Sequence, residues 1–447
     1  MERNNVLLII TDQQSGKALG VAGNPYLETP AMDGLARDGV AFQNAYCCNP
    51  VCVPSRVGMF TGHYPHESGI YLNSHRPTRE LARMPWLGRV FADAGYDTHY
   101  YGKWHLLLPL WQKQVHGFKH LEVTRGRQKD EIVAEKCARV LSSRHEKPFL
   151  MVASLVNPHN VCELARKMPL PEADIGSPPP AGECPPLPPN FGVPAGEPSA
   201  IREAHAASWE RYPTKDWGEA DWRQYLWGYY RLVEHVDRIV GRLLDALRAS
   251  KFDSNTTVVF TSDHGEGMAE HGWNQKQCFY EPVARVPFIV SHPGARRKGV
   301  LDATTLVNNG VDMIPTLADL AGISLPGKVD ALPGRSIAPA VTGGDRCTRE
   351  MSDVPIMSES EFGGFVDTNW THDGRAYGRM VRTSRFKYVV YSRGKVRESL
   401  VDMQGDPGEM VNLAGDPRYN QEMARHRQIL AAWCQQTMDD FPSIPPS

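Results

Sequence analysis

The chain has 447 residues, of which 41% are hydrophobic and 22% charged, a composition typical of a globular protein with one large domain and a smaller one. Its formal net charge is −2, so no overall basic field attracts nucleic acid or an anionic membrane surface. Because no apolar run approaches membrane-spanning length, we expect no nucleic-acid partner and no membrane partner.

The N-terminus and the cysteines bear on the cellular compartment. Residues 1–5 lead straight into a short apolar run without a secretion signal, which predicts a cytoplasmic protein, with N-terminal processing left open. Nine scattered cysteines argue against a disulfide framework and for a reducing compartment. Cys47 and Cys48 lie close to Cys52, but no second pair has zinc-finger spacing, so buried thiols are favoured over a zinc cluster.

Short apolar runs alternate with helical patterns along most of the chain. The apolar runs predict buried strands at 6–11, 98–101, 149–156, 256–262 and 286–291. The spacing of apolar residues predicts helices at 29–38, 86–94, 129–144 and 221–249. This alternation predicts an α/β fold with a mostly parallel sheet flanked by helices.

Two later segments depart from this alternation. Prolines crowd 177–198, which predicts a surface excursion, either a solvated spacer or a segment that shapes the substrate pocket. The composition changes again after about Thr342, where the chain predicts antiparallel strands at 379–391 and 397–402, a turn at 406–409 and a helix at 420–438. We therefore expect a catalytic α/β domain, 1–345, and a smaller C-terminal α+β subdomain with an antiparallel sheet, 346–447.

The most informative segment runs from Cys52 through Pro54 and Ser55 to Arg56. Pro54 favours the start of a helix, and Arg56 follows Cys52 by about one helical turn. The N-terminal end of a helix favours negative charge. The segment therefore predicts an anion-binding position at Cys52.

Polar side chains directly follow four of the predicted strands. In open α/β sheets, ligands bind beyond the carboxyl ends of the strands, so these side chains are site candidates as a group. One such residue is more often structural, but four such strand ends in one chain are improbable by chance. The candidates are Asp12, Gln13, Lys103, His105, His159, Asp263 and His264.

Some of these side chains are suited to a metal ion. Asp12 and Asp263 can share one divalent cation, with further oxygen from Gln13 and with residue 52 as another ligand. Oxygen-rich coordination favours Ca²⁺ or Mg²⁺, and His264 also suits Mn²⁺. Taken alone, Asp12 is equally consistent with a helix cap or a turn.

The basic candidates are suited to a negatively charged ester. Such a substrate needs cationic side chains to neutralise its oxygens and a proton donor for the departing oxygen. Lys103, His105, His159 and Lys276 supply these groups. Outside this context, an exposed loop lysine would be the favoured interpretation of Lys276.

These motifs together resemble the type I sulfatases of the alkaline-phosphatase-like superfamily, and the resemblance covers almost the whole chain. The family signature is C-x-P-S-R followed by T-G, which residues 52–56 and 61–62 match. Gly-Lys-Trp-His at 102–105, Ser-Asp-His-Gly at 262–265 and the tail at 402–413 extend the match. The resemblance implies a hydrolase of sulfate monoesters with an alkaline-phosphatase-like fold.

The resemblance also implies how residue 52 acts. A formylglycine-generating maturation enzyme oxidises Cys52, and the hydrated aldehyde attacks sulfur. Asp263 accepts the proton of the hydrate, which Arg56 and Lys103 hold in place. The cation is calcium in most relatives.

The remaining roles concern the substrate. The resemblance implies that Lys103, Lys276 and the metal bind the sulfate group. It further implies that His159 donates a proton to the leaving alcohol and that His105 assists collapse of the sulfated hemiacetal. In relatives, paired acids often follow the first strand, whereas Gln13 takes the second position here and removes one negative charge.

Other readings of the motifs remain open. A phosphonate monoester or phosphodiester hydrolase of the same superfamily has a similar nucleophile and metal site, but Lys103 and His105 weigh against it. A glycan-binding protein without turnover follows if Cys52 is never oxidised, and a plain α/β domain follows if the strand-end residues are coincidental.

The substrate is predicted only as a class, with a sulfated carbohydrate favoured and choline sulfate or an aryl sulfate as alternatives. Two groups of residues are candidates for the leaving-group side. His66, Glu67, His75 and Arg76 line a pocket or are surface residues, and Trp209, Trp217 and Trp222 stack on a sugar or pack against the long helix.

Overall fold

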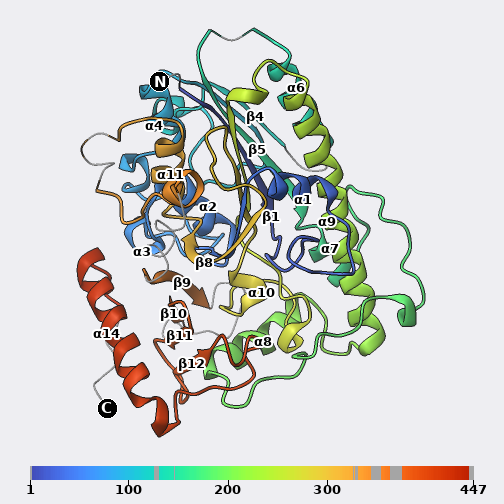
Figure 1. The fold of residues 1–447 in the computed structure, drawn as a ribbon. Coiled ribbons are helices and arrows are strands. Elements are labelled where there is room, and N and C mark those ends of the chain that lie inside the picture. The colour runs from blue at the N-terminus through green and yellow to red at the C-terminus, as the bar shows by residue number, and fades with distance from the viewer. Residues whose placement is uncertain are drawn as a thin grey trace.

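The protein is described by a computed structural model that covers residues 3–124, 130–144, 146–325, 327, 331–343, 354–362 and 375–441, with side chains omitted at 207–211. Figure 1 shows a large sheet with helices on both faces and a smaller sheet beside it, next to the C-terminal helix. The predicted α/β fold with a mostly parallel sheet and a separate antiparallel sheet is therefore confirmed. The predicted domain boundary at 345 lies outside the described residues and stays a prediction.

The large sheet contains eight of the described strands, in the order β4-β3-β5-β1-β6-β7-β2-β8. They are β1 (Asn5–Asp12), β2 (Val40–Tyr46), β3 (Asp97–Gly102), β4 (His120–Val123), β5 (Phe149–Pro158), β6 (Thr256–Ser262), β7 (Phe288–Ser291) and β8 (Val300–Asn308). β1 lies in the middle and pairs in parallel with β5 and with β6. Every residue of β1 is buried, as expected of a strand covered on both faces.

One prediction about this sheet needs correction. The strand expected at 286–291 begins at Phe288, and it runs antiparallel to β6 and to β2. Pro287 lacks a backbone N–H and cannot extend the ladder. The sequence analysis also missed β2, β4 and β8, which lack the long apolar run of β1, β5 or β6.

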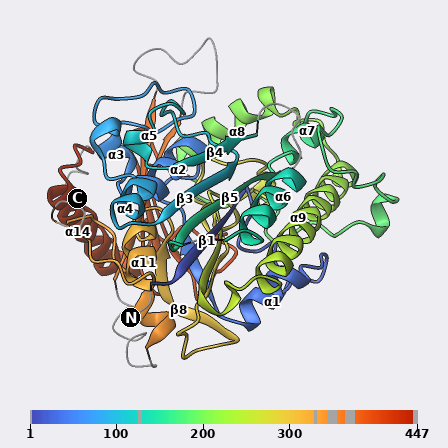
Figure 2. The ribbon, with the colours of Figure 1, turned by 90° about the horizontal axis from the view of Figure 1, so that it is seen from above.

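Helices cover the sheet on two faces, and Figure 2 shows α6 and α9 together on one side of it. The side chains of β1 alternate between the faces. Val6, Leu8 and Ile10 pack with α2 (Cys52–Thr61), α4 (Leu87–Asp93), α11 (Met313–Leu320) and α12 (Ala338–Thr342). Leu7 and Ile9 pack with α1 (Pro30–Arg37), α6 (Asp130–Leu141) and α9 (Glu219–Arg248).

The smaller sheet is antiparallel, in the order β12-β11-β10-β9. Its strands are β9 (Ile356–Phe362), β10 (Ala376–Arg382), β11 (Phe386–Tyr391) and β12 (Glu398–Asp402), and α14 (Asn420–Thr437) packs on it. Asn308, the last residue of β8, donates from Nδ2 to the carbonyl of Met357 at 2.7 Å. The two sheets are thus joined by direct hydrogen bonds; of the C-terminal strands, the sequence analysis missed β9.

The remaining described helices are short, apart from α8 (Ser199–Arg211), which the sequence analysis did not predict. They are α3 (Pro65–Ser68), α5 (Lys113–His116), α7 (Val161–Ala165) and α10 (Glu281–Ala284). The proline-rich segment 177–198 contains one 3-10 turn at Ala181–Glu183, and Asn190 anchors it by bonding to Glu270 at 2.8 Å. Among the described helices, none combines the length and apolarity that a membrane crossing requires.

Candidate active site

The ends of β1 and β6 bring two carboxylates together. The strands are in register up to Thr11 and Ser262, so Asp12 and Asp263 leave the sheet side by side. Gln13 then adopts a left-handed backbone conformation with φ of 70°. This turn directs the Gln13 N–H to Oδ1 of Asp263 at 3.1 Å.

Helix α2 brings Cys52 to the same place. Cys52 is the first residue of α2, and all ten residues of the helix are buried. Gly62 ends the helix in a left-handed conformation, which a residue with a side chain adopts only with strain. The helix start that the sequence predicts is observed, and Cys52 lies at that N-terminal end.

Arg56 ties the helix to both carboxylates. Its Nε lies 2.8 Å from Oδ2 of Asp263, and its Nη2 lies 3.0 Å from Oδ2 of Asp12. Nη1 donates to Oγ of Ser154 at 2.8 Å. All three charged side chains are fully buried, so Arg56 fixes the orientation of the carboxylates rather than facing solvent.

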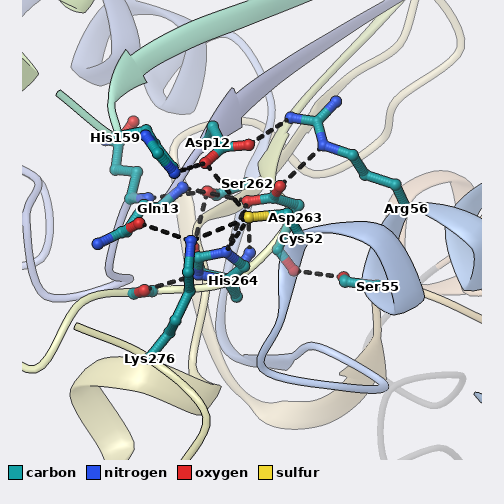
Figure 3. A network of polar contacts seen from close by, with 12 residues as sticks. Asp12, Gln13, Cys52, Ser55, Arg56, His159, Ser262, Asp263, His264 and Lys276 are labelled. Carbon is teal, nitrogen blue, oxygen red and sulfur yellow. Dashed lines mark hydrogen bonds and ion pairs between the residues drawn. The ribbon is translucent and has the colours of Figure 1, made fainter. Parts of the chain in front are cut away.

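The thiol of Cys52 points at a set of polar groups (Figure 3). Its Sγ lies 3.0 Å from Nζ of Lys276, 3.2 Å from Nε2 of His264 and 3.8 Å from Oδ1 of Asp12. The two nitrogen contacts have lengths usual for contacts to oxygen. The pocket around residue 52 therefore has the size and polarity to hold oxygen atoms at this position.

The same groups act on the ionisation of Cys52. Burial acts to raise the pKa of the thiol, but the charges of Lys276 and His264 outweigh it and hold the pKa well below its usual value. Lys103 and a hydrogen bond with His105 act in the same direction. The pocket therefore stabilises negative charge at residue 52.

The two carboxylates differ in their affinity for protons. Burial, followed by the charge of Asp12, raises the pKa of Asp263 to about 7. Burial and Cys52 act to raise the pKa of Asp12 as well, but Lys103, followed by His159 and Arg56, holds it well below its usual range. Asp12 is thus the ionised member of the pair, and Asp263 is the one that gains a proton first.

Two basic side chains from neighbouring strand ends reach Asp12. Nζ of Lys103, which follows β3, lies 2.5 Å from Oδ2 of Asp12. Nε2 of His159, which follows β5, lies 3.9 Å from Oδ1. Burial, then the charges of Lys103 and Lys276, lowers the pKa of His159 to about 4, so its imidazole is neutral at pH 7 in this state.

The last two predicted residues also lie at the pocket. Gln13 accepts a bond from Nζ of Lys276 at Oε1, over 3.0 Å. His105 has a left-handed backbone conformation with φ of 45°. Its Nδ1 is buried without a hydrogen-bond partner among the described residues. The fold therefore brings every predicted site residue to one pocket.

Supporting residues of this pocket were not predicted as site residues. Glu266 accepts from Nε2 of Gln13 at 2.6 Å, from the hydroxyl of Tyr225 at 2.6 Å and from the N–H of Gln275 at 2.8 Å. It thereby holds the side chain of Gln13, as Ser154 holds Arg56. Glu266 follows the Asp263-His264 motif, a signal for its location but not for its partners.

The donor atoms of four residues fit a divalent cation. One donor each from Asp12, Cys52, Asp263 and His264 lies within 4.8 Å of all the others. Two of the donors are carboxylates, and their mutual repulsion contributes to the raised pKa of Asp263. A cation among them would relieve that repulsion, and carboxylate and imidazole ligands suit Ca²⁺, Mg²⁺ or Mn²⁺.

The other sequence candidates are engaged elsewhere. Nδ1 of His66 lies 2.6 Å from Oε1 of Glu359 in β9, and His75 lies 3.5 Å from Glu361. Among the described residues, Cys47 and Cys48 belong to no group of potential metal ligands.

The tryptophans favour packing over stacking on a sugar. The rings of Trp217 and Trp222 meet edge to face at 5.0 Å, and Trp222 also contacts Tyr225 of α9. Both belong to a hydrophobic cluster along α9. The side chain of Trp209 lies outside the described ones.

Comparison with protein families gives two matches. Residues 4–323 match the family described as Sulfatase, which is more than half of the chain. Residues 269–436 match the family described as N-sulphoglucosamine sulphohydrolase, C-terminal. The two matches together span the large sheet, the pocket and the smaller sheet.

Individual relatives are similar over most of their length. A Δ4,5-hexuronate-2-O-sulfatase of Bacteroides thetaiotaomicron is 32% identical, with 99% of this chain and 91% of the relative covered. An ulvan-active sulfatase of Formosa agariphila is 29% identical, with 93% and 78% covered.

Solved structures agree in fold. The structure of a 2-O GAG sulfatase superposes with a TM-score of 0.85 at 30% identity, covering 99% of this chain and 94% of that one. A phosphonate monoester hydrolase of Agrobacterium radiobacter superposes with a TM-score of 0.73 at 21% identity, covering 97% and 96%. At that identity the second likeness concerns the fold alone.

Proposed function

The chain belongs to the sulfatase family and is a sulfuric ester hydrolase, and we propose that it releases sulfate from a sulfated carbohydrate with formylglycine at position 52 and a bound divalent cation. The observation that carries this proposal is the surroundings of Cys52. Its Sγ, which is itself fully buried, lies 3.0 Å from Lys276 and 3.2 Å from His264.

In this proposal, the side chain of Cys52 is modified before the protein becomes active. Oxidised by a formylglycine-generating enzyme, residue 52 would carry a hydrated aldehyde, which supplies a hydroxyl nucleophile for sulfur. Lys276 and His264 stand at distances suited to hydrogen bonds with those oxygens. Arg56 keeps the surrounding carboxylates in place, and Asp263, with its pKa of about 7, accepts a proton.

The metal ligands in this proposal are Asp12, Gln13, Asp263, His264 and residue 52. When bound, the cation would neutralise oxygens of the sulfate group. The mostly oxygen ligands suit Ca²⁺ and Mg²⁺, and His264 also suits Mn²⁺; we place Ca²⁺ first because the resemblance to the family implies it. Gln13 contributes a carbonyl oxygen in place of a second carboxylate, so the site has one negative charge fewer than a paired-acid site.

The basic side chains handle the substrate. Lys103 and Lys276 bind the sulfate oxygens, and His159 donates a proton to the leaving alcohol. His105 assists collapse of the sulfated hemiacetal at residue 52. His159 is neutral in the substrate-free pocket, partly because of the charges of Lys103 and Lys276. An arriving sulfate group offsets these two charges and thereby favours protonation of His159 when the substrate is bound.

The proposed substrate class follows from the relatives. The hexuronate-2-O-sulfatase and the ulvan-active sulfatase are similar over more than nine tenths of this chain. We therefore place a 2-O-sulfated uronic acid residue first among the substrates to test. The proposed organisation is a catalytic domain of residues 1–345 followed by a C-terminal subdomain of residues 346–447.

A combined mass and activity measurement tests the proposal. The peptide containing residue 52, from protein made with a maturation enzyme, should have the mass of the aldehyde and not of the thiol. Sulfate release is then measured on mono- and disaccharides sulfated at defined positions, with an aryl sulfate, choline sulfate and phenyl phosphonate as comparisons. Turnover by a preparation with an unmodified thiol would refute the nucleophile, and preference for the phosphonate would refute the substrate class.

The metal is tested separately. Treatment with a chelator should abolish activity, and Ca²⁺ should restore it better than Mn²⁺ or Mg²⁺. Full activity in the presence of chelator, with no metal detected in the protein, would remove the cation from the proposal.

A further inference from the structure

A second group of potential metal ligands lies at the edge of the large sheet. Asp97 and His99 are two residues apart on β3, so their side chains lie on the same face of the sheet. His120 on β4 is the direct partner of His99 in the parallel ladder. The pairing brings all three side chains together, with donor atoms within 4.8 Å of one another.

Both imidazoles already lie at metal-site spacing from the carboxylate, each next to a different oxygen of Asp97. Nε2 of His99 lies 3.2 Å from Oδ2 of Asp97, and Nε2 of His120 lies 3.2 Å from Oδ1. In a tetrahedral zinc site, bonds of about 2.0–2.2 Å put neighbouring ligand atoms roughly 3.3 Å apart. The two imidazole rings are stacked with centroids 4.4 Å apart, so both nitrogens face the same carboxylate.

A neighbouring hydroxyl orients one of these ligands. The hydroxyl of Tyr101, two residues further along β3, lies 3.1 Å from Nδ1 of His99. Metal-binding histidines commonly hydrogen-bond through the other ring nitrogen, which fixes the ring and its tautomer. When Nδ1 donates to the tyrosine oxygen, Nε2 presents its lone pair to a metal.

Exposure leaves this cluster accessible. The side chain of His99 is 5% exposed, that of Asp97 20% and that of His120 42%. The cluster therefore combines one rigid ligand with an open side for metal entry and for a water ligand. Lys119, whose Nζ lies 3.4 Å from Asp97, is 72% exposed and is free to swing into solvent.

The cluster is distant from the catalytic pocket. Lys103, which reaches the catalytic Asp12, follows the carboxyl end of β3, whereas Asp97 begins that strand. Lys103 is six positions further along the extended chain than Asp97, a distance of roughly 20 Å. The two groups of ligands therefore bind independently.

We propose that Asp97, His99 and His120 form a binding site for a divalent transition-metal ion, Zn²⁺ by preference, which clamps edge strand β4 to β3. Two imidazoles and one carboxylate are the ligand types of zinc sites that keep a water in the fourth position. Ca²⁺ requires six to eight oxygen ligands and is not suited to this set. The ligand types thus give this site a different metal preference from the catalytic pocket, for which calcium is proposed.

Zinc binding to the full-length protein tests the site. Metal-stripped wild type should bind one equivalent of Zn²⁺ more than His120→Ala and Asp97→Asn in calorimetric titrations. Because the catalytic cluster is intact in all three proteins, its own metal binding cancels in the comparison. With Co²⁺ as a spectroscopic probe, the wild type should show the absorption of a tetrahedral site with nitrogen ligands in addition to any signal that it shares with both variants.

Control variants separate binding from folding. His75→Ala removes another partly exposed histidine next to a carboxylate, Glu361, and should keep the extra equivalent. Tyr101→Phe should keep the stoichiometry but weaken Zn²⁺ binding by roughly 10- to 100-fold. Lys119→Ala should strengthen it, because a competing positive charge is removed.

The result that overturns the proposal is equal Zn²⁺ stoichiometry in wild type and His120→Ala, both verified as folded by circular dichroism. The cluster would then be a set of carboxylate–histidine hydrogen bonds only. An extra equivalent that persists in Asp97→Asn and His120→Ala but disappears in His75→Ala would place the metal elsewhere and would overturn it as well.

Discussion

Two buried charge clusters in this protein use similar residues for different purposes. The catalytic charge cluster consists of Asp12, Arg56, Lys103, Asp263 and Lys276. The inter-sheet charge cluster joins α10 and the end of β2 to the smaller sheet and consists of Tyr46, Glu281, Arg382, Lys387 and Glu409. The two clusters differ in charge balance.

The inter-sheet charge cluster is balanced. Lys387 donates to the carbonyl of Phe279 at 2.9 Å and to Glu281 at 3.0 Å, and it also pairs with Glu409. Arg382 donates to the hydroxyl of Tyr46 at 2.9 Å. Two buried cations thus face two carboxylates, and all three ammonium hydrogens of Lys387 have an acceptor. Arg285, whose side chain is 23% exposed and therefore partly screened by solvent, lies a further 3.5 Å from Glu281.

The catalytic charge cluster has an excess of positive groups. Arg56, Lys103 and Lys276 face only two carboxylates, and Lys276 points at Cys52 instead of an acid. An anion at this position is therefore stabilised, whereas the inter-sheet charge cluster has no charge left to offer. The comparison teaches that buried positive charge without a matching acid marks the catalytic cluster, while burial alone does not.

The largest effect is expected at Cys52, which lies next to the excess of positively charged side chains. Cys52→Ala should reduce kcat by roughly four orders of magnitude or more, because it removes the nucleophile. The melting temperature should stay close to that of the wild type, since the substitution removes only the sulfur atom and leaves the ion pairs of Arg56 with Asp12 and Asp263 in place. Sulfate release and thermal unfolding are the measurements, and appreciable activity in the variant would contradict the assignment.

The matching change in the inter-sheet charge cluster should act on stability. Lys387→Met leaves Glu409 buried without its cation and removes the buried cation of Glu281, which should lower the free energy of unfolding by about 3–5 kcal/mol. The kcat of the folded protein should stay unchanged. Urea unfolding with activity measured on the folded fraction checks this, and a triple variant that also carries Glu281→Gln and Glu409→Gln should recover part of the loss.

The corresponding lysine of the catalytic charge cluster should show the reverse pattern. Lys276→Met removes one group that stabilises negative charge at the reacting atoms, which should lower kcat by about 10²- to 10³-fold. Its unfolding free energy should change less than that of Lys387→Met, because no acid loses its partner. If both lysine variants lost stability equally at full kcat, the distinction between the clusters would fail.

The sequence predicted the catalytic charge cluster better than the inter-sheet one for a physical reason. Asp12, Lys103, His159 and Asp263 all follow parallel strands, and the carboxyl ends of such strands meet at one edge. Lys387 and Glu281 come together through docking of two sheets. No local pattern encodes that docking, and both residues look like ordinary surface charges in the sequence.

The sequence analysis found some strands and missed others for a similar reason. β1, β5 and β6 are continuous apolar runs, because helices cover both of their faces. β2 has two half-buried positions, and β4 at the edge alternates between exposed and half-buried ones. Their sequences resemble loops, and the orientation of β7 depends on neighbours that are distant in the sequence.

The smallest effect is expected at a third buried group, where two acids meet without a cation. Glu172 accepts from the backbone N–H of Asp130 at 2.8 Å and from Asn157 at 2.7 Å. Burial, followed by the charge of Asp130, raises the pKa of Glu172 to about 8. The folded state therefore favours protonated Glu172 more than the unfolded state does.

The sign of the pH dependence follows from this raised pKa. The contribution of Glu172 to stability is fully present below its unfolded pKa and is lost as the pH rises to about 8. Because Glu172 lines a solvent-open cavity of about 770 Å³, we expect a loss of only about 1–2 kcal/mol. Glu172→Gln stays neutral, so its unfolding free energy should fall less than that of the wild type between pH 5 and pH 9. Identical pH profiles would show that the acids are separated by solvent, and that uncompensated charge at this position has no energetic consequence.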